Sequence, residues 1–227
     1  MTKLTASKLT RFGIATALAG TMLAAPLMAD AGGTADITVA NMYLWRGLDL
    51  SNKSGAEVSG DLYYHHESGA STGIWMSSEC VSNSHETDLN LGFSKSFGYF
   101  GMDVGIYEYL YTENGDATKS DWDKTDAAEY YVAGSYGPVS LKVLQSTSVP
   151  DNRYFSLDGS YSMFGAHIGK TSRKDSQQEY TDFNVSVHPV ENLTLLVSMA
   201  TGKLIDNGGG EKDPLFVASY NWPFTMK

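Results

Sequence analysis

The sequence has a single cysteine, few basic residues and no long apolar run beyond its N-terminus. Cys80 has no partner for an internal disulfide, so an exported chain has to be stable without one. After residue 30, no segment approaches the ~20 consecutive apolar residues of a membrane-spanning helix. The 16 Lys and Arg residues stand against 26 Asp and Glu residues, which gives a net charge of −10. This acidic balance repels phosphates and argues against a nucleic-acid partner.

The first 29 residues have the layout of a secretory signal peptide. Three basic residues precede an uncharged stretch, rich in Ala and Leu, over residues 12–28, and small residues close it. We expect cleavage after Ala29 or Ala31, which leaves residues 30–227 as the mature domain. The mature chain would then carry 13 basic residues against 26 acidic ones. An uncleaved N-terminal membrane anchor is the alternative reading.

Strict alternation of apolar and polar residues dominates the mature chain. In residues 88–94, Leu89, Leu91 and Phe93 share one side, and polar residues or glycine take the other. A period of two over seven or eight residues indicates a half-buried strand rather than a helix. The 14 Tyr, 9 Phe and 4 Trp, with only six Pro, also favour strands. We expect twelve strands, near residues 35–47, 56–66, 71–80, 87–97, 100–112, 127–136, 139–148, 153–163, 166–172, 179–188, 193–202 and 214–224.

The connections between these segments are alternately tight and long. Short periplasmic turns, longer outer loops and an even strand number are typical of outer-membrane barrels. Four aromatic residues of the last segment share one side, as an outward face crossing the interface should. The sequence therefore predicts an all-β fold, a transmembrane antiparallel up-and-down β-barrel with both termini periplasmic. The count of twelve leaves ten or fourteen strands open, and the register of 100–112 is the least defined.

Most charged strand residues fall on the polar side of the alternation. We expect them to line the lumen: Arg46, Asp61, Glu79, Asp88, Asp103, Glu129, Lys142, Asp158 and Asp182. Lys95 and Lys170 fall on the other side but lie near strand ends, where long side chains reach the interface. Glu108 lies deeper, and we expect a β-bulge to turn it inward. Arg46, on the first strand, should pair with Asp61 or Glu129, either to fix strand packing or to tune which solutes pass.

Three local motifs point to chemistry but lack its context. Residues 69–73 match G-x-S-x-G, yet they lie in a hairpin with no following helix. Residues 121–126 space carboxylates like a calcium loop, without its glycine and closing glutamate. Ser186 and His188 share a strand face, which keeps a membrane-embedded hydrolase as a third hypothesis. We expect no enzyme activity, cofactor or metal site.

Two segments carry a resemblance to a known family. Residues 40–47, which contain Tyr43, Trp45, Arg46 and Gly47, closely resemble the opening strand of the TorF-like putative porins, and residues 129–138 resemble their mid-chain hairpin. Members of that family usually end on an aromatic residue, whereas here three residues follow Phe224. The resemblance implies a pore-forming proteobacterial outer-membrane barrel, inserted by the barrel-assembly machinery.

Twelve strands predict a narrow lumen, between the filled interior of eight and the open channel of sixteen. We expect a porin for passive diffusion of small hydrophilic solutes, in contact with outer-membrane lipid and lipopolysaccharide. Because acids outnumber bases in the predicted lumen, it should weakly prefer cations or zwitterions. The alternative is a non-conducting structural or adhesive barrel plugged by its inward aromatic residues: Tyr63, Trp75, Tyr107, Tyr109, Tyr131 and Tyr154.

Overall fold

The computed structural model describes residues 31–51, 55–78, 85–111, 127–147, 149, 151–174 and 176–226. The predicted leader, Glu79 and the acidic loop around residues 113–126 lie outside these residues. Within the described part of the chain, no helix has the length and apolar character needed to cross a membrane.

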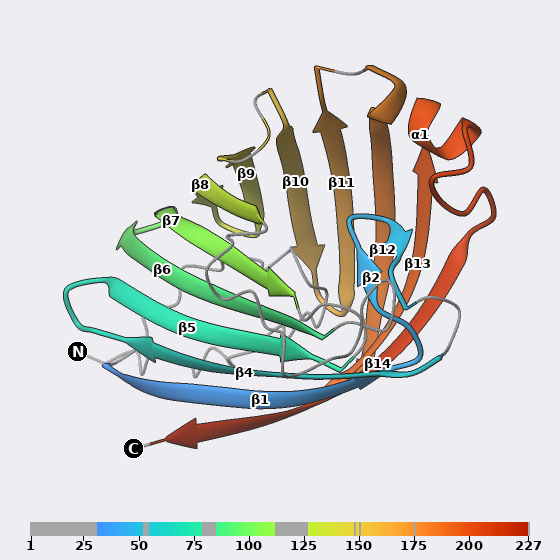
Figure 1. Cartoon of the computed structure of the whole chain (residues 1–227). Helices are drawn as coiled ribbons and strands as arrows, with labels where there is room; N and C mark the ends of the chain where they lie inside the picture. The colour runs from blue at the N-terminus through green and yellow to red at the C-terminus, as the bar shows by residue number, and fades with distance from the viewer. Residues whose placement is uncertain are drawn as a thin grey trace, which may run out of the picture.

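Twelve antiparallel strands close into a barrel, as predicted (Figure 1). Each strand pairs with its neighbours along the chain, and β1 closes the ring by pairing with β14, from Gly33 opposite Met226 to Ala40 opposite Ser219. The strands of the wall are β1 (Gly32–Ala40), β4 (Glu57–His65), β5 (Ala70–Ser77), β6 (Glu86–Phe97), β7 (Phe100–Tyr111), β8 (Ala127–Tyr136), β9 (Val139–Ser146), β10 (Arg153–Tyr161), β11 (Phe164–Ser172), β12 (Tyr180–Val190), β13 (Leu193–Thr201) and β14 (Leu215–Met226).

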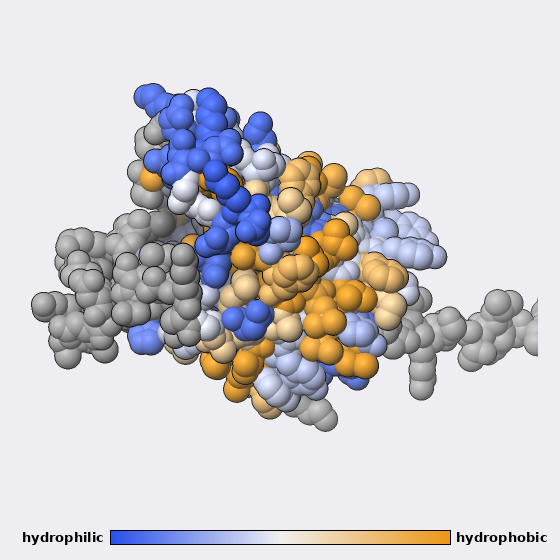
Figure 2. Space-filling model, turned by 90° about the vertical axis from the view of Figure 1, so that its right-hand side faces the viewer, coloured by the Kyte–Doolittle hydropathy of each residue, from blue (hydrophilic) through white to orange (hydrophobic). Residues whose placement is uncertain are grey.

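The polarity of the barrel is inverted relative to a water-soluble domain. On β13, Leu195, Val197 and Met199 are exposed on the outside, whereas Thr194 and Ser198 are buried inside. Figure 2 shows apolar side chains gathered in a band across one outer face, with hydrophilic ones gathered above it. An apolar belt around a polar interior is the arrangement of barrels that face lipid.

Tight turns and long connections segregate to opposite ends. Gly98 and Tyr99, Gly137 and Pro138, and two further pairs form two-residue turns at the end where β1 begins and β14 finishes. The turn between the strands predicted at 153–163 and 166–172 lies at residues 162–163, with Ser162 in the left-handed region (φ 55°). At the other end, the short helices η3 (Ser176–Gln178) and α1 (Lys203–Asp206) pack together, and Lys203 donates to Ser176.

The prediction that the first strand spans residues 35–47 is wrong. Strand β1 ends at Ala40, where the Asn41 side-chain amide donates to the Phe216 carbonyl and accepts from the Ala218 N–H. These bonds satisfy the backbone of β14 after β1 leaves it. The chain then turns inward as a small hairpin, β2 (Leu44–Trp45) and β3 (Leu48–Asp49), which Figure 1 draws inside the ring of strands.

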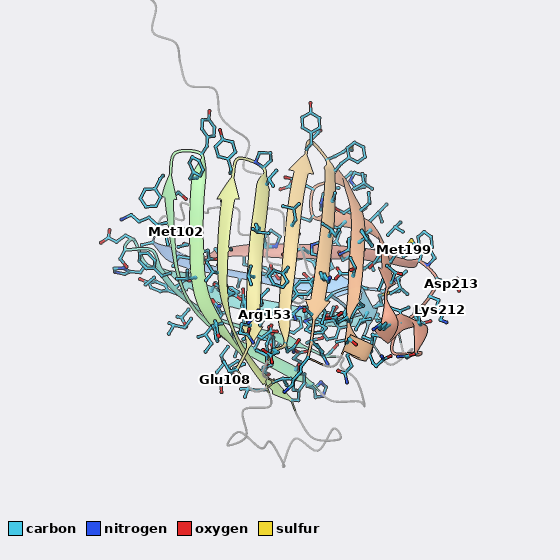
Figure 3. All side chains as sticks on the ribbon, turned by 90° about the horizontal axis from the view of Figure 1, so that it is seen from above. Met102, Glu108, Arg153, Met199, Lys212 and Asp213 are labelled. Atoms are coloured by element: carbon cyan, nitrogen blue, oxygen red, sulfur yellow. The ribbon has the colours of Figure 1, made fainter. Side chains whose placement is uncertain are left out.

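The bulge expected around Glu108 is also absent, since β7 pairs with β6 without a register break from Phe100 to Tyr111. Glu108 therefore shares the outward side with Ile106. It lies near the long-connection end of β7, far from Met102 (Figure 3), where the penalty for a charge facing lipid becomes small. Between β12 and β13 the register does shift, from Val187 to Val190.

Candidate functional site: the lumen and its inward hairpin

A sharp two-residue turn forms the tip of the inward hairpin. Arg46 and Gly47 both have positive φ, 48° and 79°, as a type I′ turn requires. A Cβ on Gly47 would lie 2.5 Å from the Asp182 Cβ and 3.4 Å from the Ala200 Cβ. The tip therefore rests directly against the inner wall formed by β12 and β13.

Two leucines anchor the hairpin from opposite sides. Leu44 packs in a buried cluster with Ala40, Leu196 and Val217. Leu48 packs against a second cluster of Tyr180, Ala200 and Ile205, and Ile205 belongs to α1 in the connection between β13 and β14. The hairpin is thus held between the wall and the folded cap at the long-connection end.

Arg46 crosses the lumen from the hairpin tip to β8. Its two terminal nitrogens bind the Glu129 carboxylate at 3.1 and 2.5 Å, and both side chains are almost completely buried. Tyr109 donates to the same carboxylate at 2.9 Å. The guanidinium also lies 4.3 Å from the ring centroids of Trp45 and Tyr154. Burial disfavours the charged guanidinium, but the negative charge of Glu129 outweighs this effect and raises the pKa of Arg46.

A second contact holds the base of the hairpin. The Tyr43 hydroxyl donates to Glu86 Oε2 at 2.6 Å, and Tyr111 donates to the other oxygen at 2.9 Å. The Tyr43 ring is fully buried and lies 5.8 Å from the Trp75 ring. Burial first, and then the Glu86 charge, raise the pKa of Tyr43 well above its usual value. Tyr43 therefore acts as a neutral hydrogen-bond donor.

A buried histidine lies beside the tip. His167 Nδ1 is 2.6 Å from Asp158, and its Nε2 is 2.9 Å from Asp182 and 3.0 Å from the Tyr154 hydroxyl. Each ring nitrogen therefore has a carboxylate oxygen within hydrogen-bond distance, and Asp182 also accepts from the Tyr154 hydroxyl. This cluster escaped the sequence reasoning. The inward parity of His167, directly opposite Asp158 across β10 and β11, was the available signal.

The other predicted lumen residues form a second group. Asp61 lies opposite Asp36 across β4 and β1, and both are partly exposed. Asp103 accepts from Tyr131 at 3.2 Å. Lys142 is buried, with its ammonium 5.1 Å from the Tyr131 ring and 5.9 Å from the Tyr107 ring. All the predicted lumen residues that the structure describes thus face inward. Arg46 does so from the hairpin, and its partner is Glu129 rather than Asp61.

Tyrosines lie flat on the inner wall where glycine leaves room. A Cβ on Gly105 would lie 2.7 Å from the Tyr131 hydroxyl, and one on Gly169 would collide with the Tyr154 hydroxyl. Tyr154, Leu144 and Tyr43 are fully buried around the hairpin. The cross-section at this level is therefore occupied by side chains, as the plugged alternative expects, whereas Asp36, Asp61 and Asp103 remain partly exposed.

The proposed serine–histidine pair has no hydrolase geometry in the described contacts. His188 Nδ1 lies 3.0 Å from the Thr194 hydroxyl, on the neighbouring strand, rather than against Ser186.

Gly47→Ala should release the hairpin tip from the wall. The added methyl group collides with Asp182, and a positive φ disfavours alanine. We expect the barrel to fold, because the wall ladder does not involve Gly47, while tryptic cleavage at Arg46 becomes faster than in the parent. Ala substitution of Gly134, which has no atom within 4 Å, is the control. Equal cleavage of both variants would contradict this reading of the tip.

Comparison with known proteins places the fold and the family. A solved structure described as "KdgM porin" is similar, with a TM-score of 0.51 and 10% identity, over 86% of this chain and 99% of that one. Another, described as "Unveiling the Mechanism Behind the in-meso Crystallization of Membrane Proteins", has a TM-score of 0.52 and 10% identity, over 86% and 84%. At such identity the likeness concerns the fold. No curated protein matches the chain. A family described as "Bacterial protein of unknown function (Gcw_chp)" matches residues 29–209, and the chain belongs to that family.

Proposed function

We propose that this chain is an outer-membrane porin in which the hairpin at residues 41–51 forms the constriction. The observation that carries the proposal is the combination of an apolar outer belt with a polar, charged interior crossed by an inward hairpin. The fold likeness to a protein named a porin and the TorF-like motif around Arg46 support it. In this proposal, residues 1–29 are a cleaved leader, and both termini are periplasmic.

Small hydrophilic solutes would pass between the hairpin and the acidic wall formed by β1, β4 and β7. Asp36, Asp61 and Asp103 are among the partly exposed lumen acids, whereas Arg46 and Lys142 are buried. Exposed carboxylates in a narrow pore raise the local cation concentration. The solute preference would therefore be weakly cationic or zwitterionic.

Planar-bilayer recording tests the function and the preference together. The parent should carry steady current and show cation selectivity in a salt gradient. Asp61→Asn with Asp103→Asn should move the reversal potential toward zero, and the selectivity should weaken at 1 M salt, where screening acts over ~3 Å. Thr201→Val, on the outside of β13, is the control. Anion selectivity in the parent would refute the proposed role of these acids.

The buried side chains around Arg46 favour a second candidate, a non-conducting barrel. A parent that folds, resists SDS until it is boiled, and stays silent in bilayers would support this candidate. Steady current that disappears on unfolding would exclude it.

Orientation has its own test. An epitope inserted at Gly208, in the exposed connection after α1, should bind antibody on intact cells. The same epitope at Asn192, in the tight turn between β12 and β13, should bind only after the outer membrane is permeabilised. The reverse pattern would place the long connections in the periplasm.

A further inference from the structure

Two basic side chains face outward on β10 and β11, near the long-connection end of the wall. Arg153 lies opposite Ser172, and Phe155 lies opposite Lys170. Arg153 and Lys170 are therefore diagonal neighbours on one outer face, with Cα atoms about 7–8 Å apart for such a pair. Both side chains are exposed, and Figure 3 labels Arg153 nearer the end that carries Glu108 than the end that carries Met102.

Apolar side chains continue the same face toward the middle of the barrel. Phe155, Ile168 and Phe183 are 39, 41 and 43% exposed, and Ile168 lies opposite Phe183. The two charges thus stand at the edge of a surface suited to acyl chains. Positive charge above an apolar face matches an anionic lipid, with its head group at the charges and its chains along the aromatic rings.

Neither charge is neutralised within the described residues. The described ion pairs involve Arg46 and His167, and the hydrogen bond of Arg153 runs from Nε to the neutral Gln145 side chain at 2.7 Å. The Glu179 carboxylate, just before β12, accepts from the Ser172 hydroxyl at 3.4 Å. In a chain of net charge −10, an uncompensated pair of bases on the lipid-facing side is an exception.

We propose that Arg153 and Lys170 form a binding site for the phosphate groups of lipopolysaccharide. The assignment rests on the proposed orientation, which places this end of the barrel in the outer leaflet. The guanidinium binds a phosphate through two N–H groups, and the Lys170 ammonium adds a second charge. Thr181, which lies opposite Lys170 in the register, supplies a neutral hydroxyl donor at the rim.

Native mass spectrometry of the refolded full-length barrel tests the site. The probes are lipid A with two phosphates, lipid A with one, and phosphatidylglycerol. Arg153→Gln with Lys170→Gln should bind bisphosphorylated lipid A at least about tenfold more weakly, since each basic residue at a membrane surface contributes about one factor of five. Arg153→Lys with Lys170→Arg should keep most of the binding. Lys95→Gln is the matched control, because Lys95 also faces outward but lies opposite Met102, near the tight turns.

The outcomes separate this site from the porin proposal. Unchanged lipid A binding in the double Gln variant would overturn the site, and so would equal affinity of the parent for phosphatidylglycerol. A loss confined to Lys95→Gln would overturn it too, by moving lipid recognition to the other end. A parent that carries no current but loses lipid A binding only in the double Gln variant would leave the site standing and refute the porin. Heat-modified migration in SDS confirms folding of each variant.

Discussion

Shortening the inward hairpin should raise the single-channel conductance severalfold. The Leu50 N–H donates to the Tyr43 carbonyl at 2.8 Å, so the two ends of the hairpin are adjacent. Replacing residues 44–49 by Gly-Gly can therefore bridge the gap without straining the wall. The replacement removes the Arg46 side chain and both leucine anchors from the lumen, and the current should rise because the cross-section widens.

The control for this variant lies outside the barrel. Deleting Glu211 and Lys212, which are exposed in the connection before β14, shortens a loop without touching the lumen. It should leave the conductance unchanged. If the hairpin deletion gave a folded barrel with the parent conductance, the hairpin would not be the constriction, and ions would pass elsewhere or not at all.

Glu129→Ala should destabilise the folded barrel by about 3–5 kcal/mol, because it leaves the buried Arg46 guanidinium without its counter-charge. Arg46→Met with Glu129→Gln should be much milder, since a neutral pair removes the uncompensated charge and keeps the volume. Urea unfolding in lipid vesicles measures both free energies. Asp61→Asn, at a partly exposed carboxylate without a basic partner in its register, serves as the control.

The coupling between the two residues is the decisive quantity. The free energies of unfolding of Arg46→Met and Glu129→Gln, each made alone, complete the comparison. If the losses of the two single variants add up to the loss of the double variant, Arg46 and Glu129 act independently. That result would contradict the ion pair as the contact that holds the hairpin.

The wall of the barrel was predictable because its two faces meet different environments. Each strand has an apolar outer side and a polar inner side, so a period of two appears in segments such as residues 193–200. Residues 42–45 are a continuous run of apolar and aromatic residues that also favours a strand, which is why the first strand was predicted too long. In the structure, residues 41–47 leave the barrel wall and turn inward. This path depends on the Arg46–Gly47 turn and on the contact of Arg46 with Glu129, 83 positions away. Within residues 41–47, only the Arg46-Gly47 pair indicates a turn, because Gly47 can readily adopt the positive φ that such a turn requires.

The error at Glu108 has a different cause. Sequence parity assigns its side correctly, and the predicted bulge rested on the cost of a charge that faces lipid. Depth in the membrane, which parity does not encode, makes the outward position tolerable near the end of β7. His167 was overlooked because its two carboxylate partners come from different strands, and the pairing register alone brings them together.

The pairing of β1 with β14 makes the order of synthesis important. Strand β1 is synthesised first, but it can pair with β14 only after β14 has been synthesised, since Gly33 lies opposite Met226. Until that strand arrives, two rows of backbone N–H and C=O groups have no acceptor or donor in hydrocarbon, and each row carries a penalty of several kcal/mol per group. In the proposed membrane location, a partly synthesised chain therefore has no stable place in the bilayer. Insertion has to follow completion of the chain, and loss of the final strand should abolish the protein rather than leave a smaller barrel.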